Sequence, residues 1–129
     1  MEKTTNNTDF AEVTIDDLTK ILDEHIEEKS KTLESLQIAV NDLVSVKNRY
    51  VIASNRLRIQ PDKIKEELGL SKAATEKQQQ AYIDDKLCKE VQDIRIAEEN
   101  VKLLKRKIDL LDDKISLEKY RIQLLMKVL

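Results

Sequence analysis

The sequence predicts an all-α fold: a long antiparallel helical hairpin, packed as a coiled coil, with a short elbow helix at its turn. Three observations predict it. Charged residues make up 37% of the 129-residue chain and aromatic residues only 3%, which is typical of long helices rather than of sheets. The last third carries a continuous apolar heptad pattern. The only proline and the only glycine, Pro61 and Gly69, stand close together near the middle, where the chain can turn back.

We expect residues 1–13 to form a disordered tail, because they are polar and carry no hydrophobic periodicity. Thr14 follows with a side chain that can cap a helix N-terminus, and Asp16 and Asp17 suit the positive end of the helix dipole. We therefore predict the first long helix over residues 14–60.

The first helix shows two sets of predicted seam positions. The early set is Ile15, Leu18, Leu22 and Ile26, and the later set is Leu33, Leu36, Val40, Leu43, Lys47, Tyr50, Ser54 and Leu57. The heptad register slips by about one residue between the two sets, near Lys29, which predicts a bend or an unpaired stretch there. Lys47 and Ser54 place polar groups in the later set, so we expect weaker pairing toward its C-terminal end.

Residues 61–75 form the predicted elbow. Pro61 lacks a backbone N–H and disfavours helical geometry in the residue before it, so the first helix ends there. A short helix follows, with Pro61 in its first turn and Gly69 at its C-terminal cap. Thr75 and Gln78 then match a capping box, in which each side chain satisfies the backbone N–H of the other residue.

The final helix, predicted over residues 76–129, carries the continuous apolar pattern, which we name the main seam. Its residues are Ile94, Ala97, Val101, Leu104, Ile108, Leu111, Ile115, Glu118, Ile122, Leu125 and Leu129. Steps of three and four alternate and Glu118 is the only polar member, so one stripe faces a partner helix along the whole segment. Because long helices in water are stabilised mainly by packing, the main seam indicates a pairing or assembly element.

A second apolar pattern repeats every seven residues on another face of the final helix. This second stripe consists of Ile96, Leu103, Leu110, Leu117 and Leu124. We expect the main seam to close the hairpin and the second stripe to form an oligomer interface, so that the protein is a homo-oligomer. The alternative is a single broad face that is buried within one chain.

A basic column runs between the two apolar patterns of the final helix. It consists of Lys107, Lys114 and Arg121, which are also seven residues apart. Charges that flank a coiled-coil seam usually pair across it. We therefore expect the column to pair with acidic residues of the first helix, such as Asp23, Glu27 and Glu34.

The sequence contains no residue constellation that indicates an enzyme. His25 is the only histidine, and neither a cysteine nor a second histidine stands near it at metal-ligand spacing. A single glycine excludes a glycine-rich phosphate loop, and adjacent carboxylates on a helix do not converge on one point. We expect no catalytic activity, no cofactor and no metal, and a packing or partly exposed role for His25.

The charge balance and the single cysteine bear on the environment of the protein. Formal net charge is −2, so any site for a polyanion has to be local. Cys88 cannot form an internal disulfide, which fits a reducing compartment, and we expect its side chain to be buried. No apolar run approaches membrane-spanning length and the N-terminus lacks the apolar region of a signal peptide. We expect a cytoplasmic protein without membrane contact, in the host cytoplasm if it is viral.

The clearest local signal for a function is a basic region around the predicted turn. Its members are Lys47, Arg49, Tyr50, Arg56, Arg58, Lys63 and Lys65. Residues 47–58 contain no acidic side chain. Lysine and arginine neutralise phosphates and an aromatic ring can stack on an unpaired base, so the region predicts a site for single-stranded DNA. The alternative is a solvated surface whose cations pair internally with Glu66 and Glu67.

The elbow contains one competing pattern. Residues 64–72 resemble the middle of a helix-turn-helix, in which a short helix and a glycine turn precede a recognition helix. Lys65 stands where a small residue normally packs, and Thr75 and Gln78 stand where the second helix should supply apolar contacts. A helix-turn-helix regulator that reads duplex DNA is therefore the weaker alternative.

Three features of the chain resemble one known family. They are the order of a long helix, an irregular elbow and a second long helix, the basic stretch Lys47–Tyr50, and Thr75–Glu76 followed by Asp85–Lys86. In these features the chain is similar to phage recombination mediator proteins of the UvsY type. The resemblance implies a ring-forming helical hairpin that binds single-stranded DNA and helps to load a RecA-like recombinase.

Two classes of function are open at this point. The first is a non-enzymatic, oligomeric accessory of recombination or replication, in which the oligomer repeats a weak basic site so that modest contacts with single-stranded DNA sum. The second is a structural or adaptor coiled coil that binds a protein partner and no nucleic acid. The near-neutral charge and the regular second stripe favour the second class.

Overall fold

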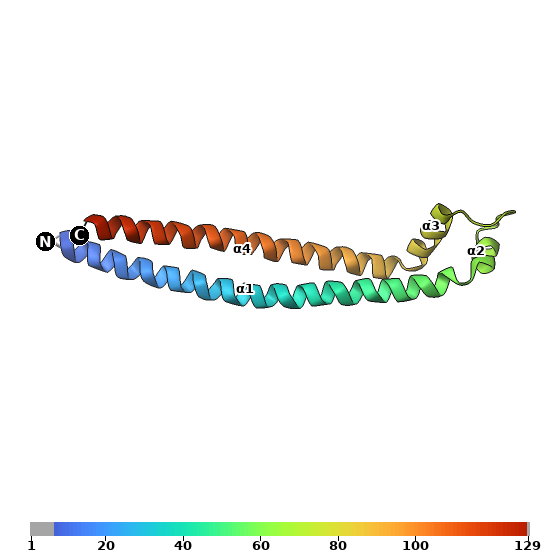
Figure 1. Ribbon diagram of the computed structural model, residues 1–129, viewed down its shortest axis with the longest axis horizontal. Coiled ribbons are helices and arrows are strands. Elements are labelled where there is room, and N and C mark those ends of the chain that lie inside the picture. The colour runs from blue at the N-terminus through green and yellow to red at the C-terminus, as the bar shows by residue number, and fades with distance from the viewer. Residues whose placement is uncertain (1–6, 129) are drawn as a thin grey trace. The chain divides into compact units, whose positions relative to one another are not determined.

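The computed structural model describes residues 7–128 of the chain, which contain four helices and no strand. The helices are α1 (Asn7–Arg58), α2 (Pro61–Glu67), α3 (Glu76–Lys86) and α4 (Cys88–Val128). α1 packs against α4, which confirms the predicted all-α helical hairpin (Figure 1). Residues 1–6 of the predicted tail and Leu129 of the main seam lie outside the described residues.

The hairpin divides into two compact units, each with its own packing. Unit 1 combines α1 up to Gln37 with α4 from Lys102 onward. Unit 2 spans Ile38–Val101 and so contains the rest of α1, the helices α2 and α3, and the start of α4. Within each unit the segments of α1 and α4 lie side by side (Figure 1).

The helix α1 begins earlier than predicted. It starts at Asn7 rather than at Thr14, so residues 7–13 are helical and do not belong to a disordered tail. Asn7 and Asp9 are residue types that favour the first turn of a helix, and the sequence therefore offers a start before Thr14. The helix ends at Arg58, close to the predicted boundary.

The inward face of α1 follows one heptad register, so the predicted slip near Lys29 is wrong. In the later predicted set, Val40 is half-buried and Ser54 is buried. The buried and half-buried positions that follow the single register are Ile15, Leu18, Leu22, His25, Lys29, Thr32 and Leu36 in unit 1, and Ala39, Leu43, Val46, Tyr50, Ala53 and Leu57 in unit 2. Steps of three and four alternate through both sets. Three predicted seam residues, Ile26, Leu33 and Lys47, are exposed instead.

Polar residues occupy inward positions in unit 1, which makes the heptad pattern of the sequence look interrupted there. Thr32 is buried, and its hydroxyl donates to the carbonyl oxygen of Glu28 at 2.8 Å. Lys29 reaches from the inward face to the carboxylate of Asp112 on α4, with 2.5 Å between Nζ and Oδ1. Because a long lysine stem can pack while its charged end leaves the seam, hydropathy alone misplaced the register.

The turn after α2 confirms the predicted roles of the single proline and the single glycine. Pro61 occupies the first turn of α2, where its missing N–H costs no hydrogen bond. Gly69 has φ of +65°, a left-handed conformation that glycine adopts without strain. Its N–H donates to Glu66 and that of Leu70 donates to Lys65, each at 3.1 Å, which is the Schellman pattern of helix termination.

The capping box is confirmed, but the single final helix is not. The backbone N–H of Gln78 donates to the Thr75 hydroxyl at 3.2 Å, and that of Thr75 donates to the Gln78 side chain at 2.9 Å. α3 then ends at Lys86, and Leu87, with φ −107° and ψ 28°, separates it from α4. Leu87 packs against the buried cluster described next, of which Ile83 is a member.

The core of unit 2 is a cluster that joins α2 and α3. Ile64 and Ile83 are 1% and 0% exposed, and Tyr82 is buried beside them. Tyr50, Leu57, Ala74 and Leu87 pack against this cluster. The elbow is therefore a packed structure, and it fixes the positions of the basic residues nearby.

Candidate nucleic-acid and assembly surfaces

The predicted basic residues all lie in unit 2, but they have different environments. Lys47, Arg49, Arg56, Arg58 and Lys63 are exposed, whereas Tyr50 and Lys65 are half-buried. Arg58 donates a hydrogen bond to the side-chain oxygen of Gln80 on α3. The region is therefore not one uniform patch, and its residues have to be considered separately.

Arg49 and Arg56 line one groove of about 280 Å³ together with Lys89 of α4. The other lining residues are Val46, Ile52, Ala53, Glu90 and Asp93. Three basic and two acidic side chains give the groove a small positive formal charge. In residues 7–128 none of the three cations forms an ion pair or a hydrogen bond through its side chain.

Sequence reasoning missed Lys89 as a member of this groove. Lys89 lies forty residues from Arg49 in the sequence, and its neighbours include Glu90. Only the antiparallel register of α1 and α4 brings it to the same groove as the two arginines. Knowledge of the pairing register between α1 and α4 would have placed Lys89 beside the two arginines.

Among the described residues no ion pair joins the basic region to Glu66 or Glu67, although the charge of Lys63 acts on Glu67. The Glu67 carboxylate accepts a hydrogen bond from the Tyr82 hydroxyl at 2.6 Å and lies 3.5 Å from Nζ of Lys86. Lys63 contributes a further favourable charge near Glu67. The hydrogen bond from Tyr82 and the charges of Lys86 and Lys63 hold the pKa of Glu67 below its usual value, and the same contact raises the pKa of Tyr82.

Tyr50, predicted to stack on a base, belongs to the packing of unit 2. Its hydroxyl donates to Asp84 at 2.6 Å and accepts from the Gln80 amide at 2.7 Å, while its side chain packs against the core cluster. Burial, and then the hydrogen bond to Asp84, raise the pKa of Tyr50 above its ordinary value. Stacking on a base would break these contacts, so we remove Tyr50 from the candidate interface.

The second stripe lies on the surface of the chain. Its five side chains are between 44% and 67% exposed. The alternative of a single broad buried face is therefore wrong, because the main seam faces α1 and the second stripe does not. A row of exposed apolar side chains at heptad spacing is unusual on a monomer and is typical of an interaction surface.

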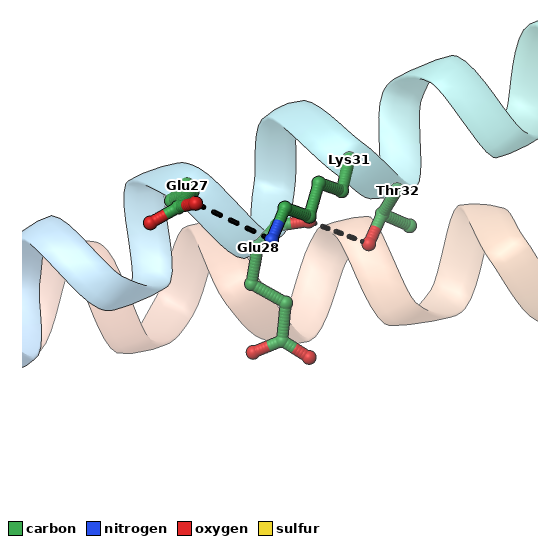
Figure 2. Close-up of polar contacts among 4 residues, drawn as sticks. All are labelled: Glu27, Glu28, Lys31 and Thr32. Carbon is green, nitrogen blue, oxygen red and sulfur yellow. Dashed lines mark hydrogen bonds and ion pairs between the residues drawn. The ribbon is translucent and has the colours of Figure 1, made fainter.

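The basic column pairs with α1 in part. Nζ of Lys107 lies 3.4 Å from the carboxylate of Glu28, an acidic residue of α1, as the prediction expects, although Glu28 is not one of the three examples that it named. Glu27 pairs instead with Lys31 on its own helix, at 3.3 Å. In Figure 2 the carboxylate of Glu28 points away from the Glu27–Lys31 pair.

Glu118, the polar member of the main seam, is only 5% exposed. Its Oε1 accepts a hydrogen bond from Arg121 at 3.1 Å. Its Oε2 is buried and has no hydrogen-bond partner in the described part of the chain. An unsatisfied carboxylate oxygen in a seam costs stability, so Glu118 is a local weakness of unit 1.

Other candidate sites are limited within residues 7–128. No group of three metal-ligating side chains occurs there, and no helix there is apolar enough over sufficient length to cross a bilayer. Cys88 is exposed rather than buried, because it lies off the main seam at the first residue of α4. Eight residues separate α2 from α3, twice the turn of a helix-turn-helix, so that geometry is not formed.

Comparison with known proteins found no relative of this chain. No protein family, no curated protein and no solved structure matches the chain. The candidate function therefore depends on the residues of this chain and on the resemblance described above.

Proposed function

We propose that the protein is a non-enzymatic, oligomeric accessory of recombination or replication that binds single-stranded DNA through unit 2. The observation that supports this function is the groove in which Arg49, Arg56 and Lys89 have no protein partner among the described residues. Free guanidinium groups bind phosphates with charge-assisted hydrogen bonds, and two of them are one heptad apart on α1. Lys47, exposed on the same helix, adds a further cation.

A single hairpin is a weak binder on this proposal. Glu90 and Asp93 line the same groove and oppose the three cations. Affinity then comes from repetition, because an oligomer offers several such grooves to one strand and the second contact is effectively intramolecular. Binding of this kind falls steeply as salt is raised, since it depends on the release of counterions from the phosphates.

The resemblance to phage recombination mediators supports the same assignment and suggests a RecA-like recombinase as the protein partner. It also suggests a viral protein that acts in the cytoplasm of its host. No property of the groove selects a base sequence, so we expect binding that tolerates any sequence.

The test compares two double variants in a titration with a labelled single-stranded oligonucleotide. Arg49→Ala with Arg56→Ala removes two groove cations, whereas Lys102→Ala with Lys105→Ala removes two exposed cations elsewhere on α4 and gives the same net charge. We expect the groove variant to lower the slope of log affinity against log salt by about 1.4, at about 0.7 per phosphate contact. Equal affinities of the two variants would exclude the groove as the DNA site.

The adaptor function stays a second candidate, because the second stripe is an exposed apolar surface of the kind that binds helices. The same titration separates the two candidates. If the unmodified protein shows no salt-sensitive binding to single-stranded DNA at low salt, the adaptor function is favoured.

A further inference from the structure

Four leucines of the second stripe lie in unit 1 and face solvent there. They are Leu103, Leu110, Leu117 and Leu124, at 53%, 60%, 47% and 44% exposed. Consecutive members are about 10.5 Å apart along α4, because an α-helix rises 1.5 Å per residue. A partner surface therefore has to present apolar groups at the same spacing.

The two helices of unit 1 carry opposite charge. Residues 102–128 of α4 contain eight basic and four acidic side chains, a formal charge of +4. Residues 15–37 of α1 contain three basic and seven acidic side chains, a formal charge of −4. A surface that complements the second stripe is therefore apolar and acidic.

The basic column places part of the positive charge of α4 directly beside the second stripe. Lys107, Lys114 and Arg121 are exposed and follow members of the stripe by four residues, so they flank it on the helix surface. Two copies of the second stripe packed on each other would bring two basic columns together. Like charges at an interface oppose association, so a second copy of α4 is disfavoured as the occupant.

The outer face of α1 has the complementary features. Ile26 and Leu33, predicted to lie in the seam, are instead 46% and 45% exposed and are seven residues apart. Acidic side chains adjoin them in the sequence: Asp23, Glu27 and Glu34, all exposed. These acids were named as examples of partners for the basic column, but within the described chain Lys107 pairs with Glu28 and Arg121 with Glu118.

We propose that the second stripe of one copy packs against Ile26 and Leu33 of α1 in a second copy of the same chain. The matching heptad spacing places two leucines of the stripe against the two apolar residues of α1. The basic column then lies beside Asp23, Glu27 and Glu34 of the neighbouring copy. This interface joins two different surfaces, so after one contact one copy keeps a free second stripe and the other keeps a free α1 surface, and the assembly continues beyond a dimer.

This proposal goes beyond DNA binding and does not depend on it, because both surfaces lie in unit 1 and the groove lies in unit 2. The experiment measures mass in solution by sedimentation velocity without nucleic acid. One variant, Leu110→Gln with Leu117→Gln, removes the stripe surface, and another, Ile26→Gln with Leu33→Gln, removes the α1 surface. Glutamine keeps helix propensity, so circular dichroism should show the same helix content in both variants.

We expect the unmodified protein to form species larger than a dimer and each variant alone to be a 15.0 kDa monomer. An equal mixture of the two variants should give a heterodimer, because each retains the surface that the other has lost. The matched control, Val44→Gln with Val51→Gln, changes two equally exposed residues seven apart on α1 in unit 2 and should keep the unmodified mass.

Several outcomes overturn the proposal: a monomeric unmodified protein, an α1 variant that still assembles, a mixture that stays monomeric, or a control that loses assembly. If a double variant loses helix content, the single substitutions Leu110→Gln and Ile26→Gln replace it, with the same expected mixture. As a charge test, Lys114→Glu should weaken assembly and Glu34→Lys in the same chain should restore it. Failure of that rescue would contradict the proposed contact between the basic column and α1.

Discussion

Units 1 and 2 are built from the same two long helices, yet they bury their side chains to different extents. Unit 2 contains the two most deeply buried side chains, Ile64 and Ile83, because α2 and α3 pack together with residues of α1. Among its described residues unit 1 has two helical segments, one of α1 and one of α4, and each covers a single face of the other. Its apolar surplus, the leucines of the second stripe, lies in solvent.

The difference shows that a heptad pattern specifies pairing but does not by itself enclose a core. Two helices bury one stripe each, and further apolar residues then need a third surface. In unit 2 the elbow supplies that surface within the chain. In unit 1 no further element of the described chain is available, and we infer that a second copy supplies it.

The largest expected effect comes from the core of unit 2. Ile83→Ala should lower the free energy of unfolding by about 3 kcal/mol, because it leaves a cavity among fully buried side chains. Leu110→Ala, a leucine truncation on the exposed stripe of unit 1, should change it by less than about 0.5 kcal/mol in dilute solution. Urea unfolding followed by circular dichroism measures both, and similar losses in the two variants would remove the contrast between the units.

A substitution at Glu118, the polar member of the main seam in unit 1, should raise stability rather than lower it. Glu118→Leu removes a buried carboxylate with an unsatisfied oxygen and places an apolar side chain in the seam. We expect the midpoint of urea unfolding to rise by an amount equivalent to about 1–2 kcal/mol. Glu118→Gln serves as the control, since it keeps a polar group in the seam, and a destabilised leucine variant would contradict the weakness assigned to Glu118.

A smaller effect is expected at the start of α3, where the capping box fixes the second half of the elbow. Thr75→Ala removes the acceptor for the Gln78 N–H and should cost about 1 kcal/mol. Thr75→Ser keeps the hydroxyl and should retain most of the stability. If alanine and serine variants melt at the same temperature, the cap does not contribute to the stability of unit 2.

The smallest expected effect concerns the dependence of unit 2 on pH. Tyr82 donates to Glu67, which lowers the pKa of Glu67 from 4.5 and raises the pKa of Tyr82 from 10.0. Glu67 therefore contributes stability that is fully present above pH 4.5 and is lost as the pH falls through its lowered pKa. Tyr82 contributes stability that is fully present below pH 10.0 and is lost as the pH rises through its raised pKa.

Tyr82→Phe removes this hydrogen bond, and the variant should lose the stability that depends on these two ionisations. The difference in melting temperature between the unmodified protein and the variant should be largest between pH 4.5 and 10.0 and should shrink on either side. Thermal melts across the pH range measure it. A difference that does not change with pH would show that the contact is not linked to these two ionisations.

The sequence predicted much of the candidate surfaces, and the errors have particular causes. The positive charge around Arg49 and Arg56 followed from residues 47–58, which contain no acidic side chain. The role of Tyr50 did not follow, because its partners Gln80 and Asp84 lie thirty or more residues away. Lys89 was missed for the same reason.

Local chemistry by itself determined the helices, the turn and the caps of this protein. Pro61 and Gly69 act through their own backbone conformations, Thr75 and Gln78 act within one turn, and the main seam follows from heptad spacing. Only the tertiary structure decided the inward register of α1, the break at Leu87 and the exposure of the second stripe. These three features depend on which helix surfaces pack against each other, and that packing energy comes from side chains far apart in the sequence.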